Sequence, residues 1–171
     1  MKDEWASHMA KTDLQLLLLT LDYGFNVASW HGPNLMGVLR GVSSTAARRR
    51  FPGRKCIGEQ VLHAAYWKQC VLNKVIGPTP FPRRGSNWPT LPDAPALAAA
   101  DALWKADLHL LRDLHARLRA GVANLSAVQL DAKLTRMIIG AAFHDIYHAS
   151  QIKLLKRMLI KKQGRRVSPL R

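Results

Sequence analysis

The sequence predicts an all-α protein folded as a four-helix bundle. Long stretches carry apolar residues at helical spacing, and four of them are long enough to form bundle helices. The chain shows no strong strand pattern, in which apolar and polar residues alternate over a half-buried strand. Hydrophobic residues make up 48% of the 171-residue chain and charged residues 22%, a globular balance that argues against general disorder. We therefore expect a single helical domain over residues 12–162.

The first predicted helix covers residues 12–29. Its leucines and Phe25 fall on one face, and Thr12 or Asp13 can cap its start. Residues 1–11 are charged, contain the tripeptide SHM and lack the apolar core of a signal peptide. We interpret them as a disordered N-terminal segment or as a tag left by cloning.

The middle of the chain predicts a second long helix followed by a long connection. Pro33 ends the first helix, and a short helix over residues 34–40 and an arginine-rich loop follow. Apolar periodicity then predicts a helix over residues 57–75. The next nineteen residues, 77–95, hold six prolines and two glycines, so we expect an extended crossover connection. Loops of this length are often functional.

Two further long helices complete the predicted bundle. One covers residues 96–120 and is expected to stop at Gly121, and the other covers residues 132–162. A short helical turn is expected between them. Residues 163–171 are strongly basic and are expected to form a frayed tail.

The chain is strongly basic, since 26 Lys and Arg residues against 11 Asp and Glu residues give a formal net charge of +15. This charge favours polyanionic partners or anionic ligands. Basic residues gather in segments 48–55 and 153–171, and Arg83 and Arg84 in the crossover are candidates for attracting an anionic substrate. No recognisable DNA-reading motif accompanies them, so solvated surface charge is the simpler interpretation. Nucleic-acid binding ranks third among the functions considered.

Membrane insertion and a disulfide framework are both disfavoured. No stretch reaches the roughly 18–20 consecutive apolar residues of a membrane helix. The two cysteines, Cys56 and Cys70, form no CxxC motif. We therefore expect a cytoplasmic protein with reduced thiols and no membrane partner.

Two histidines in the stretch FHDIYHASQI of the last predicted helix are the strongest functional signal. His144 and His148 are four residues apart, so on a helix they lie one turn apart and can aim at one point, as two metal ligands do. Small residues nearby leave space for an ion or a ligand, and buried imidazoles without partners would be costly. The alternatives are satisfied polar residues of a packed interior and a pair on a solvated face.

His63 is a candidate third ligand. Outside the last helix, it is the histidine that lies in the middle of a long predicted helix with aromatic neighbours, Tyr66 and Trp67. Three protein ligands and one open position are typical of a catalytic metal site, whereas a structural site usually has four ligands. His109 and His115 are six residues apart on the third long helix and share no face. We interpret them as surface or boundary residues, with an approach of His109 to the core as the alternative.

The stretches VLHAAYWK (61–68) and HDIYHASQIKLL (144–155) together resemble the DinB/YfiT-like family of helical bundle proteins. The motif of that family is a histidine on the second helix and H-x-x-x-H-x-x-Q on the last. The stretch DYGFNVASWHGPNLMGVLRG (22–41) is similar to the opening of one branch, and the resemblance spans about residues 12–160. It implies an up-up-down-down four-helix bundle, often dimeric, with a divalent metal ion, zinc or nickel first, held by His63, His144 and His148.

Three residues near these histidines are candidates for catalysis. Gln151 shares the face of His148 and can orient an imidazole or bond a coordinated water. Tyr147 and Tyr66 each lie three residues beyond a histidine and can donate a proton or contact a substrate. The alternatives are a helix-packing hydrogen bond for Gln151 and the role of a core aromatic residue for each tyrosine.

Other polar residues close to the histidines in sequence have simpler interpretations. Asp145 can pair with a base on a neighbouring helix. Glu59 can support His63 or act as a base, although a solvated carboxylate is the default. Cys70 can be a fourth ligand or a small core residue.

The resemblance also implies a class of chemistry. Characterised relatives include thiol-dependent transferases and an isomerase, in which the metal is thought to activate a thiol or a water. The leading hypothesis is therefore a metal-dependent thiol S-transferase or hydrolase that acts on a small-molecule thiol or electrophile. The alternative is a non-catalytic, stress-related protein that binds a metal ion or an interaction partner.

Overall fold

The computed structural model describes residues 2–28, 30, 32–126 and 128–164. This part of the chain forms six helices and no strand, which confirms the predicted all-α fold. None of these helices is long and apolar enough to cross a membrane. The helices are α1 (Lys2–Phe25), α2 (Leu35–Leu39), α3 (Ser44–Arg48), α4 (Ile57–Val75), α5 (Leu97–Ala123) and α6 (Ala132–Gly164).

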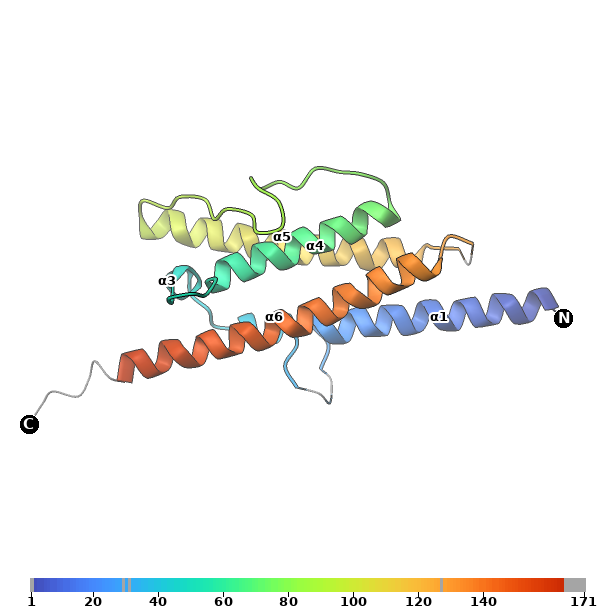
Figure 1. Ribbon diagram of the computed structural model, residues 1–171, viewed down its shortest axis with the longest axis horizontal. Helices are drawn as coiled ribbons and strands as arrows, with labels where there is room; N and C mark the ends of the chain where they lie inside the picture. The colour runs from blue at the N-terminus through green and yellow to red at the C-terminus, as the bar shows by residue number, and fades with distance from the viewer. Residues whose placement is uncertain (1, 29, 31, 127, 165–171) are drawn as a thin grey trace, which may run out of the picture.

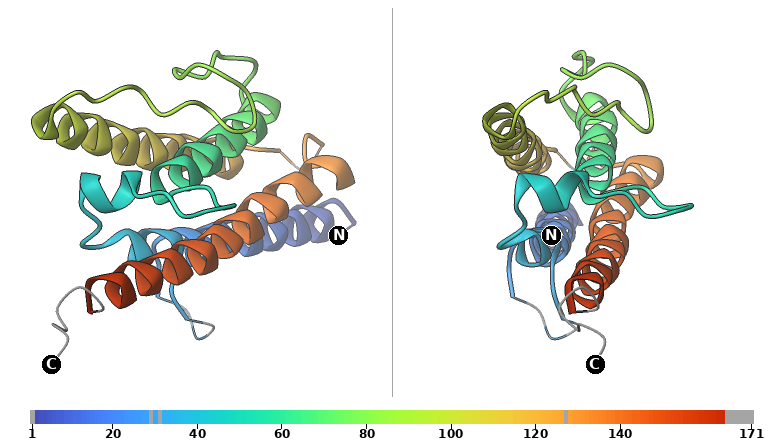
Figure 2. Two further views of the ribbon diagram at one scale, coloured as in Figure 1. Left: turned by 60° about the vertical axis from the view of Figure 1, so that its left-hand side comes forward. Right: turned by 90° about the vertical axis from the view of Figure 1, so that its left-hand side faces the viewer.

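The four long helices form two layers. Figure 1 shows α1 and α6 side by side in one layer and α4 and α5 side by side in the other. The views of Figure 2 agree, and the short helices α2 and α3 cover one end of the bundle. Each long helix contributes buried apolar side chains to a common core, among them Leu21, Leu72, Leu111 and Ile152. Burial of a side chain of this size stabilises the fold by about 1.5–3 kcal/mol.

The connection between α4 and α5 sets the order of helix directions. Residues 77–95 return the chain to the end at which α4 began, so α4 and α5 run in the same direction (Figure 1). α1 and α6 run in the opposite direction. The bundle with a long crossover connection is thus confirmed, and its helices run up-down-down-up along the chain. The expected up-up-down-down order differs because it needs two crossovers, and this chain has one.

The helix boundaries follow the predicted ones except at both ends of α1 and at the end of α5, and α3 lies where a loop was expected. α1 ends at Phe25, four residues earlier than expected, and α5 continues to Ala123. Gly121 was expected to stop α5 but lies inside it. A Cβ atom at Gly121 would lie 2.8 Å from a side-chain atom of Val75, so the glycine allows α5 to pack closely against α4.

The sequence predicted three parts of the chain: an N-terminal segment, a single domain and a basic tail. α1 begins at Lys2, so residues 2–11 are helical and not disordered as expected, and whether residues 1–11 are native or a tag stays a prediction. The single domain over residues 12–162 also stays a prediction. Of the expected basic tail, residues 165–171 lie outside the described residues.

A buried ion pair joins α4 to α6. The side chains of Lys68 and Asp145 are each 1% exposed, and 2.5 Å separates Nζ of Lys68 from Oδ2 of Asp145. The same ammonium group lies 3.4 Å from Nδ1 of His115 on α5 and 4.8 Å from the ring centroid of Phe25 on α1. One cation therefore contacts a side chain from each of the other three long helices.

Replacing Lys68 with methionine is expected to destabilise the protein strongly. The Lys68→Met variant leaves the Asp145 carboxylate buried without its counter-charge, and breaking a buried pair in this way costs about 3–5 kcal/mol of the free energy of unfolding. The double variant Lys68→Met/Asp145→Leu removes both charges and should recover most of the loss. Urea unfolding monitored by circular dichroism measures both changes.

The matched control is the exposed ion pair of Arg117 and Asp113 on α5. Arg117→Ala should change the free energy of unfolding by less than about 1 kcal/mol, because surface pairs contribute little. If Lys68→Met were as mild as this control, the buried pair would not hold the bundle together.

Candidate metal centre

Three histidines converge between the antiparallel helices α4 and α6. The Nε2 atom of His144 lies 3.1 Å from Nε2 of His63 and 3.0 Å from Nε2 of His148. One ring nitrogen from each of the three lies within 4.8 Å of the others. Zinc–nitrogen bonds of about 2.0–2.1 Å in a tetrahedral site place ligand nitrogens roughly 3.3 Å apart, so the cluster needs little movement to enclose an ion.

Hydrogen bonds on the far side of two rings set which nitrogen carries the proton. Nδ1 of His63 donates to the backbone carbonyl of Asn87, and Nδ1 of His148 donates to the side-chain carbonyl of Gln60. A carbonyl oxygen only accepts, so the proton of each neutral ring resides on Nδ1. Nε2 then keeps its lone pair and faces the centre of the cluster. This is the arrangement by which metal-binding histidines are oriented in proteins.

The three rings are held in the neutral form that a metal ion requires. His63 and His148 are buried, and His144 is half-buried. Burial, together with the neighbouring imidazoles, lowers the pKa of His148 to about 3. Burial, together with His63 and the Lys68 ammonium, lowers the pKa of His144 to about 4. Burial also lowers the pKa of His63, and the bond to Asn87 opposes that shift.

The crossover connection covers the cluster. Trp88 stacks on His63 with ring centroids 3.8 Å apart and planes 10° from parallel. Asn87 adopts a left-handed conformation (φ 57°), and its side-chain oxygen accepts a bond of 3.0 Å from Nε1 of Trp67. The left-handed turn thus presents both oxygens of Asn87 to α4. The proline-rich segment therefore contributes directly to the site, as its length indicated.

The predicted catalytic residues lie at different distances from the cluster. Tyr147 is exposed, and its ring meets that of His148 edge-on at 5.1 Å. Gln151 is half-buried and has no hydrogen-bond partner among the described residues. The ring contacts of Tyr66 are with Trp67 and Phe81, not with the three histidines.

Several other expectations are resolved by the contacts of the residues concerned. Asp145 pairs with a base on a neighbouring helix, as anticipated. Glu59 is buried rather than solvated, and it accepts from the backbone N–H of Cys56 and pairs with Arg50. Cys70 is half-buried and is not one of the clustered ligands.

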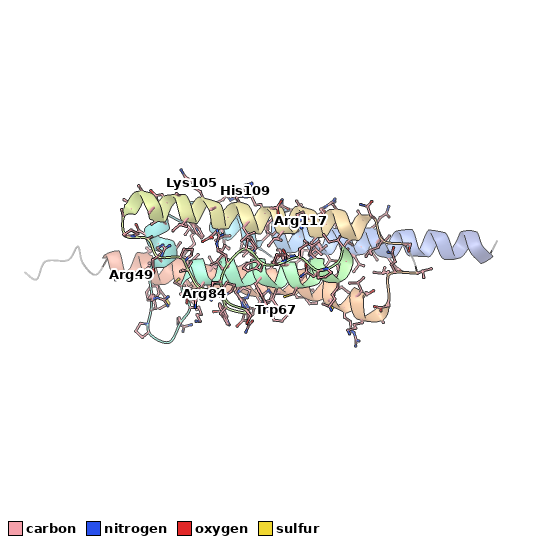
Figure 3. All side chains as sticks on the ribbon, turned by 90° about the horizontal axis from the view of Figure 1, so that it is seen from above. Arg49, Trp67, Arg84, Lys105, His109 and Arg117 are labelled. Atoms are coloured by element: carbon pink, nitrogen blue, oxygen red, sulfur yellow. The ribbon has the colours of Figure 1, made fainter. Side chains whose placement is uncertain are left out.

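The structure corrects the expectation for His115 and shows how the two arginines of the crossover are placed. His115 was interpreted as a surface or boundary residue but is 5% exposed, because its ring stacks on Phe25 at 3.7 Å. His109 is exposed on the outer side of α5 (Figure 3). Arg83 binds the buried carboxylate of Asp107 at 2.7 Å, so its charge is already compensated. Arg84 is exposed on the crossover.

Sequence reasoning missed Gln60, Asn87 and Trp88. Gln60 lies three residues before His63 and on the same helix face, so helical spacing was the available signal. For Asn87 and Trp88 the sequence shows only that they lie in a long proline-rich connection. Their position against α4 follows from the folded path of the loop.

Comparison with known protein families identifies one match. The model of the DinB superfamily matches residues 29–152, a range that includes the three histidines and the whole crossover connection. No curated protein and no solved structure matches the chain.

The burial of His115 next to the metal-site helices predicts a measurable pH dependence of stability. Burial and the charges of Lys68 and Arg119 lower the pKa of His115 from 6.5 to about 2. Between these values the unfolded chain binds a proton that the folded chain does not. Stability from this residue is therefore complete above pH 6.5 and is lost as the pH falls. His115→Asn keeps an acceptor near Lys68 and removes the titration.

Urea unfolding at pH 7, 6 and 5 measures the effect. From pH 6 to 5 the free energy of unfolding should fall in the wild type and less steeply in His115→Asn. The two slopes should differ by about 1.4 kcal/mol per pH unit. His109→Asn, on the solvent side of the same helix, is the control and should follow the wild type. Equal slopes in all three proteins would contradict the burial of a neutral His115.

Proposed function

The chain belongs to the DinB superfamily, and from this premise we propose that it is a metal-dependent enzyme, either a thiol S-transferase or a hydrolase. The observation that carries the proposal is the convergence of the Nε2 atoms of His63, His144 and His148. Hydrogen bonds hold two of the rings in the tautomer that ligation needs.

The donor set fits a divalent transition-metal ion. Imidazole nitrogens suit zinc and nickel, and three of them leave a coordination position open. Among the described residues, no cysteine or carboxylate joins the three histidines in the cluster. When bound, the ion would supply Lewis-acid chemistry that lowers the pKa of a thiol or water at its open position.

The residues of the chain would control access to that position. Trp88 shields one face of His63, and the partly exposed Trp67 lies beside His144 at a ring-centroid distance of 6.4 Å. Because His144 is half-buried while His148 is buried, we assign the substrate side to His144.

Two residues of α6 are the proposed catalytic groups. The phenol of the exposed Tyr147 would donate to the electrophile or to the departing group. Gln151, seven residues beyond His144 on the same helix face, would bind the substrate through its amide. We assign Tyr66 to the packing of the crossover against α4, because its ring contacts Phe81.

The partners and setting of the protein follow from the same proposal. The substrates would be a low-molecular-weight thiol and an electrophile. Two free cysteines, Cys56 and Cys70, fit the proposed reducing cytoplasm. A homodimer is proposed from the resemblance to the family.

Metal content tests the ligand set. We expect the wild type, purified after growth with added zinc, to carry close to one ion per chain. His144→Ala and His148→Ala should each carry far less, because each variant loses one of three nitrogen donors. His109→Ala, which removes an exposed histidine on α5, is the matched control and should match the wild type.

Plasma mass spectrometry measures the metal, and circular dichroism confirms that each variant is folded. Folded wild type and folded histidine variants with the same metal content would reject the ligand assignment.

Thiol transfer tests the reaction. The metal-loaded wild type should couple at least one low-molecular-weight thiol from a panel to an aryl halide electrophile. His144→Ala and chelator-treated wild type should be slower by about a hundredfold. Product absorbance gives the rates, and the uncatalysed reaction is the baseline. If metal is present but the wild type is no faster than His144→Ala with any thiol, the non-catalytic metal-binding function is favoured.

A further inference from the structure

A second concave site lies where α5 begins. It is a cavity of about 560 Å³, open to solvent and lined by α3 and the residues after it, by the end of the crossover and by the first turn of α5. Neither the three histidines nor Gln60, Asn87 and Trp88 line it. The cavity is therefore separate from the candidate metal centre.

Three consecutive arginines dominate the wall of this cavity. Arg48, Arg49 and Arg50 all line it, and no acidic residue does. Arg49 is exposed at the edge of the molecule, where Figure 3 labels it. The arginine-rich segment of the sequence thus forms one side of a hollow rather than a uniformly solvated face.

These arginines keep donors for a ligand. Arg48 uses one terminal nitrogen to donate to the carbonyl of Pro92 at 2.7 Å, and Arg50 uses one to donate to Glu59 at 3.1 Å. A guanidinium carries five N–H donors, so both retain several. Glu59 is also shared with Lys55 at 3.4 Å, so one carboxylate faces two cations there.

Carboxylates on α5 are occupied elsewhere. Asp101 accepts from the hydroxyl of Ser44, and Asp107 binds Arg83, although it also attracts Arg48 electrostatically. Asp93 and Asp101 precede and follow lining residues in the chain but do not line the cavity, so its wall carries three positive charges and no negative one.

The start of α5 adds to the positive potential. Leu97 and Ala100 of its first turn line the cavity, and Ala96 has no side chain that can cap the helix. The first turn holds no acidic residue. Its peptide N–H groups and the positive end of the helix dipole thus reinforce the field of the arginines.

We propose that this cavity binds the phosphate group of a small molecule. Guanidinium groups match phosphate oxygens in paired hydrogen bonds, and the hydroxyl of Thr45 in the wall is a further donor. The volume is that of a small-molecule site, and Ala94, Pro95 and Leu97 offer apolar surface to the remainder of the ligand. The site is independent of the metal centre and of the reaction proposed there.

Inorganic pyrophosphate is the probe, added to the full ¹⁵N-labelled chain at about 0.1 M salt. We expect saturable shifts of the backbone amide signals of Arg49, Leu97 and Ala98. Shifts confined to His63 and Asn87 would place the anion at the metal centre and overturn the proposal. An absence of saturable shifts would also overturn it.

Two arginine variants distinguish specific binding in the cavity from non-specific attraction to the net positive charge of the protein. Arg49→Gln should weaken pyrophosphate binding about tenfold, because it removes a charged donor of the wall. Arg117→Gln changes the net charge equally but lies farther along α5 (Figure 3) and should bind as the wild type does. Equal weakening in both variants would show non-specific attraction and overturn the proposal.

A short DNA duplex tests the other source of phosphate groups. If the duplex shifts the same amides while pyrophosphate does not, the cavity reads a nucleic-acid backbone and the small-molecule assignment fails. If pyrophosphate binds and the duplex competes only at low salt, the small-molecule assignment stands.

Discussion

The buried ammonium group of Lys68 is the contact on which the arrangement of the bundle depends. It binds Asp145 on α6, lies near His115 on α5 and sits over the ring of Phe25 on α1. Burying an ammonium group costs several kcal/mol unless its partners surround it, so a helix register that brings these partners to one place is favoured over one that separates them. Lys68 lies five residues after His63, and Asp145 is next to His144. The register that satisfies the cation therefore also brings the histidines together.

The path of the crossover connection also determines which residues surround the histidine cluster. Because α4 and α5 run in parallel, the chain must travel the length of the bundle between them. The returning segment passes over α4, where Asn87 fixes the tautomer of His63 and Trp88 covers its ring. An antiparallel hairpin would need only a short turn and would leave this face of α4 open to solvent. The long loop thus completes a site that the helices begin.

The sequence predicted the helices, the crossover and the three histidines, because each depends on local spacing or on a motif. His144 and His148 share a face by helical geometry alone. The sequence did not predict the burial of His115 or the position of Asn87, because both depend on contacts between residues distant in sequence. Gly121 shows the same limit: a glycine near a helix end is typical of a stop, and only the approach of Val75 shows that it permits close helix packing.

Among the described residues the histidine cluster holds no carboxylate, which bears on how the proposed enzyme would activate its nucleophile. In the described part of the chain, Glu59 is held by Cys56 and Arg50, and Asp145 by Lys68, so neither is free to act as a base beside the histidines. Three neutral ligands would leave a bound divalent ion its full charge, which would favour an anionic nucleophile. Such an ion lowers the pKa of a bound water to about 7 in three-histidine zinc sites, and it would lower the pKa of a thiol as well. In the proposed enzyme the ion itself would therefore take the place of a carboxylate base, whether the nucleophile is a thiol or water.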